Sequence, residues 1–164
     1  MHGNSAQKPI IIGVDGSQSS IEALRKAAEL AAAFGAPLEA IAAWQFPMTY
    51  EGAFIDELWS PEGDAKSILS TSIKAAFGAE KPEHLTTLTI PGPTAQVLIK
   101  RSKSASMLVL GSRGRGGFAG LLLGSVSTAC AQHAHCPVLI MHNLARHAHG
   151  AADKDSNAPV DAAV

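Results

Sequence analysis

A glycine-rich segment with two arginines is the part of this sequence best suited to bind an anion. It starts at Gly111 and contains Arg113, Gly114 and Arg115, and nine residues separate Gly114 from Gly124. Glycine lets the backbone approach a ligand closely and adopt positive φ, and arginine donates to phosphate oxygens. These glycines could instead be simple turn residues. The combination of five glycines and two arginines in one loop favours the anion site.

A helix is expected to start at Gly124-Ser125, directly after this segment. The first N–H groups of a helix lack intrahelical partners, and the helix dipole places partial positive charge beside them. Both properties favour an anion. Ser125 either adds a hydroxyl donor or serves only as the helix cap. We therefore predict that bare main-chain amides hold the anion, with arginine charge beside them.

Asp15, at the end of the first predicted strand, is the second candidate for contact with a ligand. An Asp before a glycine is often only a turn residue that hydrogen-bonds its own backbone. Ligands of open parallel sheets, however, bind beyond the carboxyl ends of the strands. If the first and fourth strands are neighbours, Asp15 and the segment that starts at Gly111 line one crevice.

Short apolar runs alternate with helical patterns along most of the chain, and they predict the elements that position these residues. Mostly continuous apolar strands that alternate with helices are typical of a parallel sheet covered on both faces. The third strand mixes polar and apolar residues, so we expect it at an edge. The predicted strands are 10–14, 38–44, 84–90, 107–110 and 138–141, and the predicted helices are 19–34, 62–77, 94–103 and one from about 124.

Cap and turn signals set the expected ends of these elements. Ser19 has the capping-box spacing to Glu22, and Ser17 is a rival cap for the same helix. Thr94 is expected to cap the third helix. Residues 45–60 break the pattern and are predicted to form a long loop.

Composition indicates one domain with its own core. The chain has 164 residues, of which 46% are hydrophobic, and a formal charge of −1. This near-neutral balance argues against a general nucleic-acid or anionic-membrane binder, because both need an excess of basic residues. The polar residues 1–8 are expected to be a disordered N-terminus and 143–164 a flexible tail, which leaves 9–142 as the domain.

Cysteine content and hydropathy indicate a cytoplasmic protein. Cys130 and Cys136 are the only cysteines and form no disulfide framework, so a reducing compartment is the simplest interpretation. We expect both to be small buried hydrophobic residues. The most apolar stretch, 118–131, is shorter than the roughly 20 residues of a spanning helix and is interrupted by glycine.

Several catalytic and metal-binding patterns do not occur in the sequence. There is no G-x4-G-K-(S/T) motif, no G-x-G-x-x-G after the first strand and no G-x-S-x-G elbow. The histidines and cysteines between 130 and 142 do not have the spacing of a complete zinc ligand set. We expect no metal site made of protein side chains alone.

Three segments resemble the nucleotide-binding universal stress proteins. Gly111-x2-Gly114-x9-Gly124-Ser125 matches the G-2x-G-9x-G-(S/T) signature of that family. Residues 11–17 look like its first strand and turn, and residues 108–114 and 136–140 look like its fourth and fifth strand regions. The resemblance covers roughly residues 8–142.

The resemblance implies a doubly wound α/β fold with strand order 3-2-1-4-5 and ATP across the ends of the first and fourth strands. Asp15 would contact the adenosine portion, and the backbone near Ala43 would read the adenine edge. Mg²⁺ would bridge the phosphates. The residues that the resemblance places at the nucleotide are Gly13, Val14, Asp15, Ala43, Leu110, Gly111, Arg113, Gly114, Gly124, Ser125, Val126 and Ser127.

These expectations describe a regulatory module whose ATP occupancy changes its dimer contacts or its surface for an unknown downstream protein. The last strand, 138–141, would pair with its copy in a homodimer, because it is an apolar edge and the resemblance implies the same. A slow ATPase or nucleotide-transferring enzyme is the alternative, with Asp15 as the only candidate to activate water. A third possibility is an interaction protein that has lost the ligand, which the intact glycine set disfavours.

Overall fold

Five parallel strands form one sheet in the order β3-β2-β1-β4-β5. The computed structural model describes residues 7–46, 59–115 and 123–142. The order confirms the expected doubly wound sheet, and β3 is an edge strand as its mixed sequence predicts. The strands are β1 (Ile10–Gly13), β2 (Leu38–Trp44), β3 (Leu85–Pro91), β4 (Met107–Gly111) and β5 (Val138–Met141).

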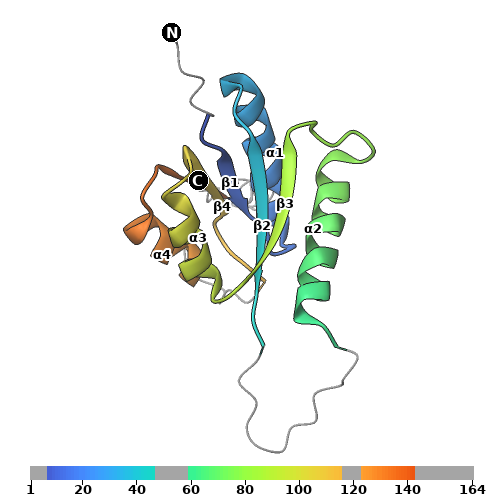
Figure 1. Cartoon of the computed structure of the whole chain (residues 1–164), viewed down its shortest axis with the longest axis vertical. Helices are drawn as coiled ribbons and strands as arrows, with labels where there is room; N and C mark the ends of the chain where they lie inside the picture. Colours follow the sequence, from blue (N-terminus) through green and yellow to red (C-terminus); the bar gives the residue numbers. More distant parts are fainter. Residues whose placement is uncertain (1–6, 47–58, 116–122, 143–164) are drawn as a thin grey trace, which may run out of the picture.

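Four helices cover the two faces of this sheet. α1 (Gln18–Phe34) and α2 (Pro61–Phe77) pack on one face, and α3 (Thr94–Ser102) and α4 (Ser125–His133) pack on the other. Figure 1 shows α3 and α4 on one side of the strands and α2 on the opposite side. Within the described segments, no helix combines the length and the hydropathy needed to cross a membrane.

The first strand shows why the apolar runs are continuous. Ile10 and Ile12 pack into the core beneath α1 and α2, whereas Ile11 packs into the core beneath α3 and α4. All three side chains are almost completely buried, because the strand lies in the middle of a sheet with both faces covered.

Helix caps differ from the sequence prediction at two places. Ser17, not Ser19, is the N-cap of α1, and its side chain accepts a hydrogen bond from Ser20 N at 3.2 Å. Thr94 is wrong as the cap of α3, since Pro93 occupies that position without a side-chain hydrogen bond. The extended backbone of Pro93 (φ −60°, ψ 128°) makes Thr94 the first helical residue instead.

The second and fifth strands have their predicted bounds, and the other boundaries that differ from the prediction do so by one residue. The first strand ends at Gly13 rather than Val14, although Val14 N still donates to Ile41 O at 2.9 Å. The second helix starts at Pro61, where the missing N–H of proline costs no helical hydrogen bond. The third strand is shifted to Leu85–Pro91, and the third helix ends at Ser102 with Lys103 as its C-cap.

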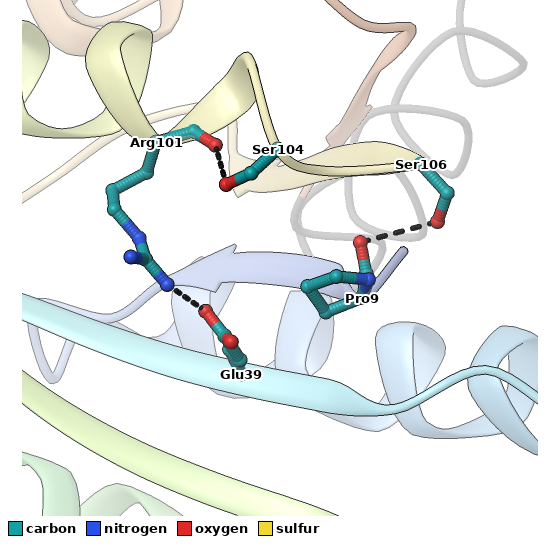
Figure 2. A network of polar contacts seen from close by, with 5 residues as sticks. All are labelled: Pro9, Glu39, Arg101, Ser104 and Ser106. Atoms are coloured by element: carbon teal, nitrogen blue, oxygen red, sulfur yellow. Dashed lines mark hydrogen bonds and ion pairs between the residues drawn. The ribbon is translucent and has the colours of Figure 1, made fainter. Parts of the chain in front are cut away.

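A polar network fastens the amino ends of the strands, opposite the predicted binding edge (Figure 2). Arg101 of α3 forms an ion pair with Glu39 of β2, and its carbonyl oxygen accepts from Ser104 Oγ at 3.1 Å. Ser106 Oγ donates to the carbonyl oxygen of Pro9, also at 3.1 Å. The network therefore links α3 and the entries to β1, β2 and β4.

Candidate functional site

The carboxyl ends of β1 and β4 lie side by side at the centre of the sheet. Ile10, Ile11 and Ile12 pair in register with Met107, Leu108 and Val109. From β1 the chain continues to β2 on one side, whereas β4 and β5 lie on the other. A parallel sheet opens a crevice at this kind of switch point, and the predicted adjacency of these two strands is confirmed.

A cavity of about 130 Å³ lies at this crevice. Nine of the twelve predicted site residues line it. Ser20, Thr94 and Leu98 also line it, and sequence reasoning missed them. The signal that could have identified Ser20 and Thr94 is their position in the first turn of a helix that directly follows a strand. The predicted residues in the lining are Gly13, Val14, Asp15, Leu110, Gly111, Arg113, Gly114, Val126 and Ser127.

Three predicted site residues lie outside the cavity lining. Ala43 lies near the end of β2, in register with Ile90 of β3. Gly124 is the N-cap of α4, and the exposed Ser125 is its first helical residue. The helix therefore starts as predicted, but glycine rather than Ser125 takes the cap position.

Gly111 and Gly114 allow the loop backbone to lie close to Ser19 and Asp15. The expectation that these two glycines adopt positive φ is wrong. Among the described residues, positive φ occurs only at other glycines, such as Gly16. A Cβ at Gly111 would lie 2.5 Å from Ser19 Oγ and 2.8 Å from the backbone of Ser19. A Cβ at Gly114 would lie 2.7 Å from Asp15 Oδ2. The loop is thus pressed against the turn after β1 and the start of α1.

Asp15 joins two segments that are distant in sequence. Its Oδ1 accepts from Ser17 N at 3.0 Å and Ser17 Oγ at 2.6 Å, which is the turn role expected for Asp before Gly. Its Oδ2 accepts from Arg115 N at 3.2 Å. The carboxylate therefore ties the turn to the glycine-rich loop, and it also lines the cavity.

Three consecutive carbonyl oxygens of the loop are bound by donors outside it. Gly111 O accepts from Ser127 Oγ at 2.8 Å, and Ser112 O accepts from Gly124 N at 2.8 Å. Arg113 O accepts from Ser19 Oγ at 2.6 Å. These bonds hold the negative ends of three peptide dipoles on α4 and α1.

Main-chain amides near these carbonyls have no acceptor. Within the described residues, neither Arg113 N nor Gly114 N donates a hydrogen bond. The amides of the first turn of α4 add further donors, because they precede the first intrahelical bond, from Thr128 N to Gly124 O. Bound carbonyls and free amides at one place make a site that favours an anion.

Helix dipoles and the charge of Arg113 also favour an anion in the cavity. Ser20 of α1, Thr94 of α3 and Ser127 of α4 all line the cavity, so three helices begin at it. Each N-terminus contributes partial positive charge. Arg113 also lines the cavity, and Asp15 supplies the opposing carboxylate.

A larger hollow in the described structure does not share these properties. This hollow, of about 440 Å³, lies between α2 and β3 and is lined by Lys66, Lys74 and Lys81 together with hydroxyl and apolar side chains. It contains none of the predicted site residues and lies away from the switch point. Over the described ranges, no three His, Cys, Asp or Glu side chains are grouped to hold a metal ion.

The fold and the crevice define a doubly wound α/β domain with main-chain amides that lack acceptors at its switch point. The family model of the universal stress protein family matches residues 7–142. The chain therefore belongs to the universal stress protein family.

Relatives and solved structures agree with this assignment. The universal stress protein Rv2623 of Mycobacterium tuberculosis is 35% identical over 136 residues, which are 82% of this chain and 45% of that protein. The chain spans about half the length of the curated relatives it matches. A universal stress protein crystallised with cAMP is 29% identical, covers 84% of this chain and 98% of its own, and has a TM-score of 0.62. A universal stress protein of Archaeoglobus fulgidus in complex with dAMP shares the fold at 21% identity, with a TM-score of 0.60 and 83% and 98% coverage.

Proposed function

We propose that this chain binds an adenine nucleotide, ATP with Mg²⁺, at the crevice between β1 and β4. The observation that carries the proposal is the pair of amides without acceptors, Arg113 N and Gly114 N, beside three bound carbonyls. The relative crystallised with cAMP supports an adenine nucleotide as the ligand class. The charge from three helix N-termini favours a ligand that carries phosphate.

The nucleotide would extend beyond the cavity. Ligand pockets usually measure about 300–1,000 Å³, so the cavity of about 130 Å³ has room for only part of it. Asp15 would face the adenosine portion and the backbone near Ala43 the adenine edge. The phosphates would lie on the loop from Gly111 to Gly114 and on the first turn of α4. Mg²⁺ would be held chiefly through the phosphates, since it needs few protein ligands in such a site.

We propose a regulatory binding module rather than a catalyst. A general base must lie within reach of the proton that it takes. The three hydrogen bonds from Ser17 and Arg115 hold the Asp15 carboxylate against the turn and the loop, where it would face the adenosine portion rather than the terminal phosphate. ATP occupancy would then act on dimer contacts or on the surface seen by a downstream protein. A slow ATPase or nucleotide-transferring enzyme is the alternative.

Mass spectrometry of the ligand released from the purified protein tests the nucleotide. We expect an adenine nucleotide, chiefly ATP, at a stoichiometry near one per chain. Protein that carries no nucleotide, and binds none when ATP is added, would contradict the proposal.

Turnover separates the binding module from the enzyme. Enzymes commonly turn over about 1–10³ times per second. We expect hydrolysis of bound ATP to stay below about one event per minute, on the order of a hundredfold slower than the low end of that range. A clearly faster release of phosphate would favour the enzyme.

The dimer and the compartment are further parts of the proposal. We propose a homodimer through β5, which pairs only with β4 among the described strands and consists of four apolar residues. A cytoplasmic location fits two cysteines without a disulfide.

A further inference from the structure

We infer that Ser19, which the sequence indicated only as a possible helix cap, is a positioning residue for the phosphate-binding loop; this inference rests on the proposed function. Ser19 lies in the first turn of α1 and is 6% exposed. Its Oγ donates to the carbonyl oxygen of Arg113 at 2.6 Å, across 94 positions of sequence. The bond ties the start of α1 to the glycine-rich loop.

This hydrogen bond fixes the orientation of the peptide group between Arg113 and Gly114. The described peptide bonds are all trans, so the C=O and N–H of one peptide point in opposite directions. With its oxygen on Ser19, the peptide directs the Gly114 N–H away from α1. Gly114 N lies beside the N-cap of α4, 3.6 Å from the position of a Cβ built on Gly124. The Gly114 amide therefore joins the donors at the start of α4.

Ser17 does not replace Ser19 as the donor to this carbonyl. Ser17 Oγ is 3.3 Å from Arg113 O but only 2.6 Å from Asp15 Oδ1. A serine hydroxyl has one proton to donate, and the shorter bond to a carboxylate is the stronger one. Ser19 is thus the principal donor that holds the Arg113 carbonyl away from the ligand.

Loss of the Ser19 hydroxyl should weaken the binding of the phosphates and leave the binding of the nucleoside unchanged. Without its donor, the Arg113–Gly114 peptide is free to rotate and to turn its carbonyl oxygen toward the phosphates. A carbonyl dipole in that place repels an anion, and an amide donor to it is lost. Adenosine carries no phosphate, so its binding should depend little on this peptide.

Ser19→Ala tests the inference when the dissociation constants of ATP and adenosine are measured by calorimetry. We expect affinity for ATP to fall about tenfold and affinity for adenosine to stay within about twofold, since a tenfold change is the size of one hydrogen bond to a charged group. Ser72→Ala is the matched control. Ser72 is 1% exposed, and its Oγ has no hydrogen-bond partner among the described residues. It should change neither constant.

A second measurement does not depend on a ligand. Hydrogen exchange of the Ser112 and Arg115 amides, which donate to Met141 O and Asp15 Oδ2, should be faster in nucleotide-free Ser19→Ala than in Ser72→Ala. Ser19→Cys, which keeps the side-chain volume but donates weakly, takes the place of Ser19→Ala if that variant does not fold.

The outcomes separate the two proposals. Wild type that binds no adenine nucleotide would overturn the proposed function itself. Wild type that binds ATP, together with unchanged ATP affinity and unchanged exchange in Ser19→Ala, would overturn the role of Ser19 alone. An equal loss of affinity for ATP and adenosine would show a merely structural role and would also overturn it.

Discussion

At the scale of single residues, the site depends on where glycines allow two backbones to meet. Gly111 lies against Ser19, and Gly114 lies against Asp15, each closer than a Cβ permits. Contact of this kind places the loop amides at the ends of β1 and β4, with the Asp15 carboxylate joining the turn to the loop. Arg115 folds over Gly16, where a built Cβ would be 3.0 Å from its Nη2.

Gly114→Val should abolish nucleotide binding while leaving the fold intact. Its side chain would displace the Asp15 carboxylate or push the loop away from β1, and both changes disorganise the amides. We expect ATP affinity to fall at least about 100-fold, roughly 2.7 kcal/mol. Copurified nucleotide and a binding isotherm measure the effect. Gly63→Ala, where the added Cβ would meet only the Ser60 side chain at 3.3 Å, is the control. A Gly114→Val protein that still copurifies with ATP would show that the phosphate loop lies elsewhere.

The two cysteines should differ in reactivity. Cys130 is fully buried, as predicted, whereas Cys136 is only half-buried. Burial raises the pKa of Cys130 to about 11, and burial also raises the pKa of Cys136. Because the thiolate is the nucleophile, iodoacetamide at pH 8 should label Cys136 first and Cys130 only after unfolding, as read by mass spectrometry.

The same pKa shift sets a pH dependence of stability. Unfolded Cys130 ionises near its ordinary pKa of 9.0, while the folded protein keeps the proton up to about 11. The contribution of Cys130 to stability is therefore complete below pH 9 and is lost between about pH 9 and 11. Equal labelling of Cys130 and Cys136 in native protein would contradict the burial and the raised pKa of Cys130 on which both predictions depend.

At the scale of elements, the sequence was sufficient for the strands and for most helices. Apolar runs such as Ile10–Ile12 are continuous because both faces of the sheet are covered. The strands could therefore be predicted from these runs. The cap of α3 was mispredicted, since threonine is a strong cap type but Pro93 already provides the extended backbone. The bond from Ser19 to Arg113 could not be predicted, because it joins residues 94 positions apart through the packing of α1 on the loop.

The ion pair of Glu39 and Arg101 should stabilise the junction of β2 and α3. The two side chains are 21% and 34% exposed, so water screens the pair less than it screens a surface pair. Glu39→Gln should lower the free energy of unfolding by about 1 kcal/mol, which corresponds to roughly 2–4 °C in Tm. Thermal and urea unfolding measure this loss.

A more exposed ion pair provides the comparison. Glu29→Gln removes the partner of Lys26 in α1, where the side chains are 64% and 41% exposed, and should cost almost nothing. Equal effects of the two substitutions on the free energy of unfolding would mean that the Glu39–Arg101 pair stabilises the fold no more than an exposed ion pair does. Nucleotide affinity should be unchanged in both, because neither pair lies at the cavity.

At the scale of the whole molecule, the stabilising polar network and the proposed binding crevice lie at opposite ends of the strands. The network around Glu39 and Pro9 joins the amino ends of the strands, and the amides without acceptors lie at the carboxyl ends. Substitutions at such distant sites are expected to add independently.

The β5 edge carries the prediction for the assembly. Ile140 is half-buried and belongs to neither core cluster, unlike its neighbours Val138, Leu139 and Met141. Its side chain is therefore available to a second β5 strand, and an unpaired apolar edge favours such pairing. Light scattering at micromolar concentration should give twice the monomer mass of 16.9 kDa. Ile140→Lys should give the monomer with nucleotide affinity retained, because charge at an edge strand opposes pairing while the cavity is untouched. Thr86→Lys on the opposite edge, in β3, should remain a dimer. A wild type that scatters as a monomer, or a dimer lost equally in both variants, would mean that β5 is not the interface.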